Sequence, residues 1–339
     1  MTHSKRRSFK KRVLVTGAAG FIGSHVVDHC LNLGFEVVAT DDLSGGFIEN
    51  VSKEATWIQG DLKDPDFVES LWEGVGYSYV YHMAAYAAEG LSHFIRSYNY
   101  QTNLVASMHL INQSVKHSVE CFIFASSIAV YGRNQVPMTE DLIPQPEDPY
   151  GISKYAVELD LKAAHEMFGL NHVIFRPHNV YGERQNIADK YRNVIGIFMN
   201  QVLQGKPMSV FGDGLQTRAF SHVDDVAPLI ARAPLTLGAI NEVFNIGADT
   251  PYTILDLVEA IAKAFAVSPE ARHMPERNEV VHAFSNHEKV RKVFNPAPTV
   301  SLHEGIARMA KWVEAQGPAV PVEFKNIEIL KNLPQGWRV

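Results

Sequence analysis

The sequence predicts an α/β protein, a doubly wound parallel sheet with a smaller mixed α/β lobe beside it. Short apolar runs rich in β-branched residues alternate with helix-like patterns through the first half of the chain. Glycine or polar residues follow directly where several of these runs end. Alternation of this kind is typical of parallel sheets covered by helices. The 339 residues are enough for two lobes.

The first predicted unit is a strand, a tight turn and a helix. The apolar run begins at Val13, and Gly17, Gly20 and Gly23 follow with the spacing Gly-x-x-Gly-x-x-Gly. Gly17 permits the turn, Gly20 lets the backbone approach a pyrophosphate, and Gly23 lets the helix pack closely on the strand. The helix N-terminus then offers N–H groups and its positive dipole end to phosphates. This pattern predicts a dinucleotide site.

An acidic pair follows the second predicted strand, residues 35–40. Asp41 stands 18 residues after Gly23, and Asp42 comes next. A carboxylate at this place can accept hydrogen bonds from both ribose hydroxyls and repels a 2′-phosphate. No Lys or Arg lies between Asp41 and Asn50 to hold such a phosphate. The sequence therefore predicts NAD rather than NADP, and the alternative is a solvated surface turn.

The remaining elements of the first half continue the alternation. We expect strands at residues 55–59, 77–81, 120–125 and 171–175, and helices at residues 67–72, 94–116 and 150–167. Ligands of such sheets bind at the carboxyl ends of the strands. The residues that fall at those ends are Asp41, Asp61, Ala84, Ser127 and Arg176.

The second half of the chain is less regular. It predicts helices at 193–203 and 254–265 and strands at 208–211 and 243–246, of which the last could rejoin the sheet. We assign residues 1–11 to a basic, disordered tail, residues 12–178 to a Rossmann-type NAD-binding lobe that residues 219–250 rejoin, and residues 179–218 and 251–339 to a substrate-binding lobe.

Composition excludes several classes of function. The net charge of −6 argues against nucleic acid as the main partner, and no window approaches 18 apolar residues, so we expect no membrane span. Cys30 and Cys121 both lie in apolar segments, which suits core residues in a reducing cytoplasm. The 15 histidines show no metal-ligand spacing, and we expect no metal site.

A tyrosine and a lysine are spaced to share one face of a predicted helix. Tyr150 and Lys154 stand at positions i and i+4. A phenol with an ordinary pKa of about 10 is a poor base, but a nearby ammonium and a positive nicotinamide ring favour the phenolate. Ser127, at a strand end, could hydrogen-bond the same substrate oxygen. Such pairs also arise by chance, so the prediction of a catalytic set depends on the dinucleotide turn as well.

These motifs resemble the extended short-chain dehydrogenase/reductase family, in its nucleotide-sugar epimerase and dehydratase branch. The resemblance extends from Val13 to about Trp312. The stretches that carry it are residues 16–23 (TGAAGFIG), 82–85 (HMAA), 126–132 (SSIAVYG), 150–154 (YGISK), 176–182 (RPHNVYG) and 217–225 (TRAFSHVDD).

The resemblance implies the role of each site residue. The cofactor residues it implies are Gly17, Gly20, Phe21, Ile22 and Gly23 at the pyrophosphate, Asp41 and Asp42 at the ribose, Asp61 and Leu62 at the adenine, and Ala84, Asn103, Tyr150 and Lys154 on the nicotinamide side. The nucleotide-sugar residues it implies are Ser127, Asn179, Asn193, Phe211, Arg218 and Arg277. Matching helices of the family pair two subunits, so the resemblance also implies a homodimer.

The turn after Ser127 discriminates within the branch. Dehydratases of this branch have acidic residues there and decarboxylases a glutamate, whereas this chain has Ile128 and Ala129. The economical interpretation is epimerisation, with bound NAD taking a hydride and returning it, and a UDP-sugar 4-epimerase is the commonest function of the pattern. The alternatives are a 4,6-dehydratase, a decarboxylase, a net dehydrogenase or reductase, and a non-catalytic NAD-binding sensor.

Three departures from the family pattern concern the substrate. Ala219 stands where an aspartate is usual, and the segment after Arg277 is a residue shorter, which leaves Glu279 only a candidate for the nucleotide ribose. Glu89 lies in a loop that should border the sugar, where it could repel a uronic acid or attract a cationic amino sugar. A solvated loop carboxylate is an equal alternative for Glu89.

Overall fold

A seven-stranded parallel sheet forms the centre of the larger lobe in the computed structural model, which describes residues 10–133, 136–276 and 282–337. The order reverses between β1 and β4, and such a reversal marks the ligand-binding crevice of Rossmann-type sheets. Across the sheet the strands are β11 (Glu242–Ile246), β6 (His172–Pro177), β5 (Cys121–Ala125), β4 (Tyr79–His82), β1 (Arg12–Thr16), β2 (Glu36–Asp41) and β3 (Thr56–Gln59).

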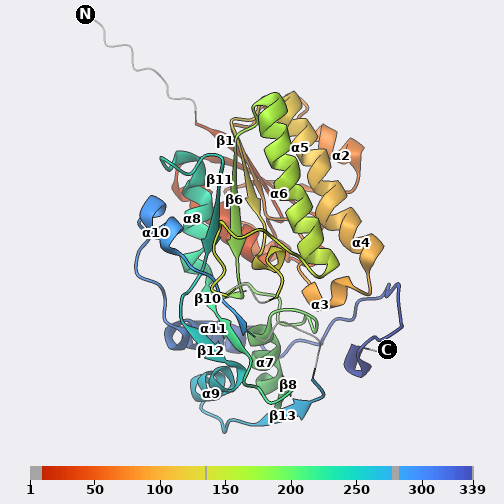
Figure 1. Ribbon diagram of the computed structural model, residues 1–339, viewed down its shortest axis with the longest axis vertical. Coiled ribbons are helices and arrows are strands. Elements are labelled where there is room, and N and C mark those ends of the chain that lie inside the picture. The colour runs from red at the N-terminus through yellow and green to blue at the C-terminus, as the bar shows by residue number, and fades with distance from the viewer. Residues whose placement is uncertain (1–9, 134–135, 277–281, 338–339) are drawn as a thin grey trace, which may run out of the picture.

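Helices cover both faces of this sheet (Figure 1). Separate apolar clusters lie under the two helix layers, because strands buried on both faces carry apolar side chains on each. One layer holds α1 (Phe21–Asn32), α8 (Ala227–Arg232) and α10 (Glu288–Phe294), and the other holds α2 (Pro65–Ser70), α5 (Ala106–Lys116) and α6 (Pro149–Phe168). Cys30 and Cys121 are buried free thiols within these clusters, as predicted.

The predicted helix at 94–116 is interrupted. The structure has α4 (Arg96–Tyr100), a π-helical turn at Gln101–Val105, and then α5. The wider turn buries Asn99, Asn103 and Ser107, polar side chains that the apolar periodicity alone did not place inside. A short helix, α3 (Glu89–Ser92), precedes this region.

The smaller lobe lies below the sheet edge in Figure 1. Its apolar core lies between three helices, and short strand pairs surround it. The helices are α7 (Val194–Leu203), α9 (Ile254–Ala264) and α11 (Leu302–Gln316). The strands are β7 (Val180–Tyr181) with β10 (Ser221–His222), β8 (Met208–Phe211) with β13 (Ala271–Met274), and β9 (Thr217–Ala219) between β12 (Pro251–Thr253) and β14 (His282–Ala283).

Two segments cross between the lobes. β11 pairs with β6 in the large sheet, the position expected for residues 243–246. Helix α10 also packs on this sheet, which differs from the assignment of all residues 251–339 to the smaller lobe. The reason is that Val290 and Phe294, one helical turn apart, cover the apolar strand residues Phe175 and Phe244.

The chain after α11 returns to the larger lobe. On the way it contacts the segment assigned to the substrate-binding lobe, where Val322 N donates to the Ala188 carbonyl at 2.8 Å. The Glu328 carboxylate accepts hydrogen bonds from the backbone N–H groups of Ser97 (2.8 Å) and Tyr98 (2.9 Å), at the start of α4. Figure 1 shows this dark-blue segment, residues 318–337, ending beside α3. Within the described residues no helix is both long and apolar enough to cross a membrane.

Candidate active site

A cavity of about 1620 Å³ lies between the carboxyl ends of the large-sheet strands and the smaller lobe. A pocket for one small ligand usually measures about 300–1,000 Å³, so this cavity has room for two large ones. It contains the predicted site residues from both lobes, with two exceptions. The predicted residues that line it are Gly17, Gly20, Phe21, Ile22, Gly23, Asp41, Asp42, Asp61, Leu62, Ala84, Ser127, Tyr150, Lys154, Asn179, Asn193, Phe211 and Arg218.

The glycine turn fits a pyrophosphate for steric and electrostatic reasons. Gly17 has φ +66°, and a Cβ atom there would lie 2.6 Å from the backbone nitrogen of Ala84. A Cβ at Gly23 would overlap the Gly17 carbonyl. Among the described residues no side chain caps the start of α1 at Gly20, and its first turn contains no acid. The positive end of α1 therefore faces the cavity and suits an anion.

The acidic residues at the ends of β2 and β3 lie beside this turn. The Asp41 carboxylate accepts hydrogen bonds from Leu43 N (2.8 Å) and Ala19 N (3.2 Å). Burial raises the pKa of Asp41, and these backbone hydrogen bonds oppose that rise. A carboxylate has further lone pairs for ribose hydroxyls. Asp61 forms an ion pair with Lys63 at 2.8 Å, so that its charge is partly neutralised. The carboxylate oxygens and the uncapped start of α1 in this half of the cavity therefore fit the ribose and the pyrophosphate of NAD.

Tyr150 and Lys154 share one face of α6, as the spacing predicts. Lys154 Nζ donates to the Ala125 carbonyl at 2.7 Å and lies 5.9 Å from the centre of the Tyr150 ring. Burial lowers the pKa of Lys154 to about 7. Burial raises the pKa of Tyr150, while a hydrogen bond with the Ser127 side chain lowers it. Tyr150 thus lies beside Ser127, where the two side chains could contact the same substrate hydroxyl.

The sequence did not predict the buried network behind this set. Arg176, a strand-end residue, forms an ion pair with Glu158 of α6 at 2.5 Å and donates to Tyr131 Oη at 2.7 Å. Glu158 also accepts a hydrogen bond from Ser126, and Tyr131 donates to Asn245. The network ties β5, α6, β6 and β11 together directly behind the catalytic candidates. Charged hydrogen bonds of this kind fix the orientation of the elements that carry them.

Asn103 does not line the cavity, contrary to prediction. It is buried, and its amide oxygen accepts from Tyr86 N at 2.8 Å while its amide nitrogen donates to Tyr86 O (3.1 Å) and Asn99 Oδ1 (2.8 Å). Its amide is thus used inside the protein. Asn103 fixes the loop that starts at Tyr86, and this loop borders the cavity. The second exception, Arg277, lies outside the described residues, as does Glu279.

The substrate half of the cavity is lined by residues on unusual backbone. Asn179 and Asn193 have φ of +40° and +65°, a region in which asparagine is tolerated better than most residues. Asn179 Nδ2 donates to the Ala219 carbonyl at 3.2 Å. Arg218 Nη1 donates to the neighbouring Thr217 carbonyl at 2.9 Å. Arg218 and Phe211 place a cation and an aromatic ring on the same wall, a combination suited to a nucleotide diphosphate.

Further charged and aromatic residues line this half that the sequence did not single out. Arg192 pairs with Asp189 at 2.6 Å and lies over the Tyr86 ring at 4.6 Å. The positive charge of Arg192 lowers the pKa of Tyr150, whereas the negative charge of Glu89 raises this pKa. Trp337 is buried and also borders the cavity. These residues come from loops far apart in sequence, and no local spacing brings them together.

Comparisons with known proteins agree with this geometry. The model of the NAD dependent epimerase/dehydratase family matches residues 13–247. A putative UDP-glucose 4-epimerase of Methanocaldococcus jannaschii is 33% identical over 306 residues, covering 89% of this chain and 98% of that protein. The solved UDP-glucose 4-epimerase of Thermotoga maritima, with UDP-glucose, is 34% identical with a TM-score of 0.85, covering 90% and 99% of the two chains.

A third similar protein was solved with both ligands. The UDP-glucuronic acid 4-epimerase of Bacillus cereus, in complex with UDP-glucuronic acid and NAD, is 29% identical with a TM-score of 0.83, covering 90% of this chain and 99% of that one. The overlap extends over nearly the whole length of each similar structure, so both lobes are shared.

Proposed function

This chain belongs to the NAD dependent epimerase/dehydratase family, and we propose that it is a UDP-sugar 4-epimerase. The observation that carries the proposal is the convergence of Tyr150, Lys154 and Ser127 beside a turn that contains no acid. That turn, Ile128–Val130, is a short 3-10 helix that begins at Ser127. Elimination of water from the sugar needs a further acid or base, whereas epimerisation needs one proton acceptor.

Two carboxylates raise the pKa of Tyr150 by their charge, those of Glu89 and Asp148. Asp148 Oδ1 accepts from Gly151 N at 2.9 Å and caps α6, so this oxygen serves the helix. Glu89 is the first residue of α3, a different element from the turn after Ser127. Neither residue occupies the place in which dehydratases of this branch carry their acids, and this supports the epimerase over the dehydratase.

In the proposed reaction Tyr150 Oη accepts the proton of the sugar hydroxyl and later returns it. Ser127 hydrogen-bonds the same sugar oxygen and keeps it in line with Tyr150. When bound, NAD supplies a reversible hydride acceptor. Lys154, buried beside Tyr150, favours the deprotonated phenol when it carries its own proton. Burial of Tyr150 and Lys154 limits the access of water to the proton transfer.

The nucleotide diphosphate is proposed to lie along the smaller lobe. Arg218 can neutralise its charge and hold two of its oxygens at once. Phe211 offers a ring for the base, and Asn179 and Asn193 offer amides for the sugar and phosphates. Lys190 also lines the cavity on this side, and it forms an ion pair with Glu323 at 2.7 Å.

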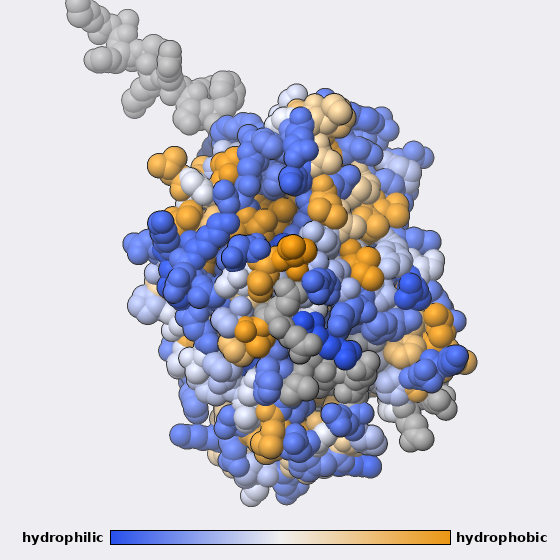
Figure 2. Space-filling model, viewed as in Figure 1, coloured by the Kyte–Doolittle hydropathy of each residue, from blue (hydrophilic) through white to orange (hydrophobic). Residues whose placement is uncertain are grey.

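We further propose a homodimer in the cytoplasm. Val105, Ile152 and Leu159 are 42%, 40% and 51% exposed on the helical layer of α5 and α6. Figure 2 shows apolar side chains over the part of the surface where α5 and α6 lie in Figure 1, within a largely hydrophilic face. A second copy of these helices would cover them. The buried thiols of Cys30 and Cys121 support a reducing compartment.

A panel of UDP-, GDP-, dTDP- and CDP-sugars tests the proposal. The purified protein is incubated with each sugar, the epimers are separated by chromatography, and NADH is followed by absorbance. The expected result is conversion of a UDP-sugar to its 4-epimer without net NADH. Loss of water would instead indicate a dehydratase, stoichiometric NADH a dehydrogenase, and binding without turnover a sensor.

A further inference from the structure

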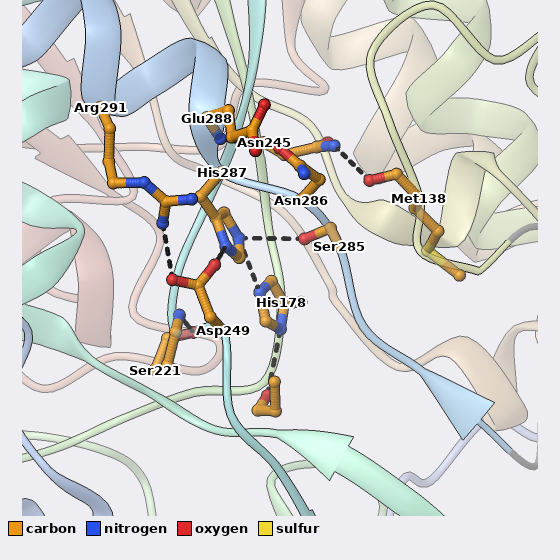
Figure 3. Close-up of polar contacts among 12 residues, drawn as sticks. Met138, His178, Ser221, Asn245, Asp249, Ser285, Asn286, His287, Glu288 and Arg291 are labelled. Atoms are coloured by element: carbon orange, nitrogen blue, oxygen red, sulfur yellow. Dashed lines mark hydrogen bonds and ion pairs between the residues drawn. The ribbon is translucent and has the colours of Figure 1, made fainter.

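Asp249, His287 and His178 form a chain of polar contacts (Figure 3). The chain runs from the exposed Asp249 side chain to His178, which lines the cavity. Asp249 follows β11, His287 directly precedes α10, and His178 follows β6. His287 Nδ1 lies 2.7 Å from Asp249 Oδ1, and His287 Nε2 lies 3.1 Å from His178 Nε2. His178 Nδ1 in turn lies 3.0 Å from the Ala219 carbonyl. Both histidines are buried, whereas the Asp249 side chain is 53% exposed.

These contacts require one proton more than two neutral imidazoles carry. The Ala219 carbonyl can only accept, so His178 Nδ1 must hold a hydrogen. The Asp249 carboxylate also accepts, so His287 Nδ1 must hold another. The contact between the two Nε2 atoms then needs a third hydrogen, because two facing lone pairs would repel. The pair therefore carries a net positive charge in this geometry.

Ring orientation supports a hydrogen bond between the histidines. The ring centres are 5.1 Å apart with an angle of 15° between planes. The two rings are therefore nearly parallel and offset, and the 3.1 Å contact between the two Nε2 atoms joins their edges. Gly247 makes room for this arrangement, since a Cβ there would lie 2.6 Å from His178 Nε2. Ser285 Oγ lies 3.0 Å from His287 Nε2 and offers it a second acceptor.

The contacts of the two rings favour His287 as the site of the extra proton, because its Nδ1 faces the Asp249 carboxylate. Burial lowers the pKa of His178 to about 3, so His178 is the neutral partner. The hydrogen bond from His287 lowers the pKa of Asp249, which also pairs with Arg291 of α10 at 2.6 Å. Glu288, next to His287, is exposed, and Glu140 accepts from Asn245 N on neighbouring β11 at 2.8 Å. An imidazolium at His287 thus lies between an ionised Asp249 and a neutral His178.

The chain ends at the strand that holds the proposed diphosphate ligand. The Ala219 carbonyl accepts hydrogen bonds from both His178 Nδ1 and Asn179 Nδ2. Ala219 belongs to β9, and so does Arg218. His178 and Asn179 therefore fix β9 against the carboxyl end of β6, at the junction of the two lobes.

We propose that His178 and His287 are positioning residues for nucleotide binding, and that the proton they share holds Asn179 and Arg218 in place. This inference rests on the proposed function, because it takes Asn179 and Arg218 as ligands of the nucleotide sugar. When the pair loses its proton, either two Nε2 lone pairs face each other or His178 shifts its hydrogen away from Ala219. Either change weakens the chain of contacts that runs from Asp249 to the Ala219 carbonyl and loosens the position of β9, so nucleotide affinity falls as the pH rises.

Calorimetric titration with UDP, from about pH 5.5 to about pH 9, tests the proposal on the full chain. The wild-type protein is expected to lose about tenfold in UDP affinity across this range, the value of one charged hydrogen bond. His287→Gln cannot hold the extra proton and is expected to bind weakly at every pH, with a flat profile. His303→Gln, on the exposed face of α11, is the matched control and should keep the wild-type profile.

Nitrogen NMR of the histidine rings gives a readout that does not depend on UDP. The signals missing from His287→Gln identify His287, and both of its ring nitrogens should carry hydrogen at low pH. A neutral His287 across the range, or a pH-dependent affinity that persists in His287→Gln, would overturn the proposal. Failure to bind UDP at any pH would count against both the proposed function and the positioning role, while an active enzyme with a pH-independent UDP affinity would contradict the positioning role alone.

Discussion

The pyrophosphate and ribose part of the cofactor half is formed by residues close together in sequence, whereas the substrate half is formed by distant segments. Gly17, Gly20, Gly23 and Asp41 come from one strand–helix–strand unit. The substrate half combines the loop after Tyr86 with three later segments, residues 179–193, 211–218 and 329–337. Local spacing therefore specifies the cofactor, while long-range packing shapes the space for the sugar. The loops of the substrate half can change without disturbing the glycine turn of the cofactor half, so we expect substrate choice to depend on these loops.

Tyr150 lies where the two halves meet, and its removal should have the largest effect. Tyr150→Phe is expected to lower kcat by about 10³-fold, because the proton acceptor is lost while the ring remains. Bound NAD, measured after denaturation of the purified protein, should not change. Tyr155→Phe is the matched control on the same helix, because Tyr155 does not line the cavity. Unchanged turnover in Tyr150→Phe would contradict the mechanism.

The glycine turn offers a test of the cofactor half alone. Gly17→Ala should lower the free energy of unfolding by about 3 kcal/mol and abolish NAD retention, since the Cβ adds a clash with Ala84 to backbone strain. Gly34→Ala has a similar φ of +83° but open space around it, and should lose only about 1 kcal/mol. Urea unfolding and NAD content measure both. Equal losses in the two variants would show that the close approach at Gly17 is unimportant.

Lys154 provides a test that depends on pH. Its pKa of about 7 lies below the ordinary 10.5, so between these values the unfolded chain binds more protons than the folded one. Stability should therefore rise with pH across this window. Lys154→Met should raise the free energy of unfolding by about 2 kcal/mol at pH 7, with the gain vanishing near pH 10.5.

The control for that change is Lys162→Met on the same helix, where the lysine side chain is 71% exposed. Urea unfolding at the two ends of the pH window should show no pH-dependent gain for this variant. A gain of the same size and pH dependence at Lys162 would mean that the burial of Lys154 is not its cause.

A substitution in the substrate half should change the KM for the nucleotide sugar and leave the amount of bound NAD unchanged. Trp337 packs at the ring edges of Tyr191 (5.4 Å between centres) and Phe94 (6.2 Å). Trp337→Ala is expected to raise KM for the nucleotide sugar by about tenfold with NAD content unchanged, because the loop that holds Phe94 loses support. Leu330→Ala, with a side chain 68% exposed, should match the wild type. Loss of NAD in Trp337→Ala would contradict a division between the two halves.

The elements and the cofactor turn could be predicted because their signals are local. The apolar pattern of the sequence predicted β1, α1 and α6, and the i, i+4 spacing predicted that Tyr150 and Lys154 share one face of a helix. The buried amides were harder to predict, because Asn103 carries a polar side chain on a helix whose period changes at a π-turn. Arg192 and Trp337 gave no usable signal, since their partners, Tyr86 and Phe94, are far away in the chain.

His178 shows the same limit within a motif that was itself informative. It stands in the stretch RPHNVYG, yet its role depends on His287, which lies 109 positions away. The local motif indicates only that His178 follows the end of a strand. Only the three-dimensional arrangement shows that the two imidazoles meet and that Asp249 leads to the surface.

Isotope retention during turnover tests the proposed epimerisation most directly. A UDP-sugar accepted by the enzyme is prepared with deuterium on C4 and converted in ordinary water, and both epimers are analysed by mass spectrometry. If Tyr150 removes only the hydroxyl proton and the carbon-bound hydrogen returns from the cofactor within the cavity, both epimers should keep the deuterium at C4. Loss of the label to solvent would contradict the mechanism, because it would mean that the carbon itself is deprotonated.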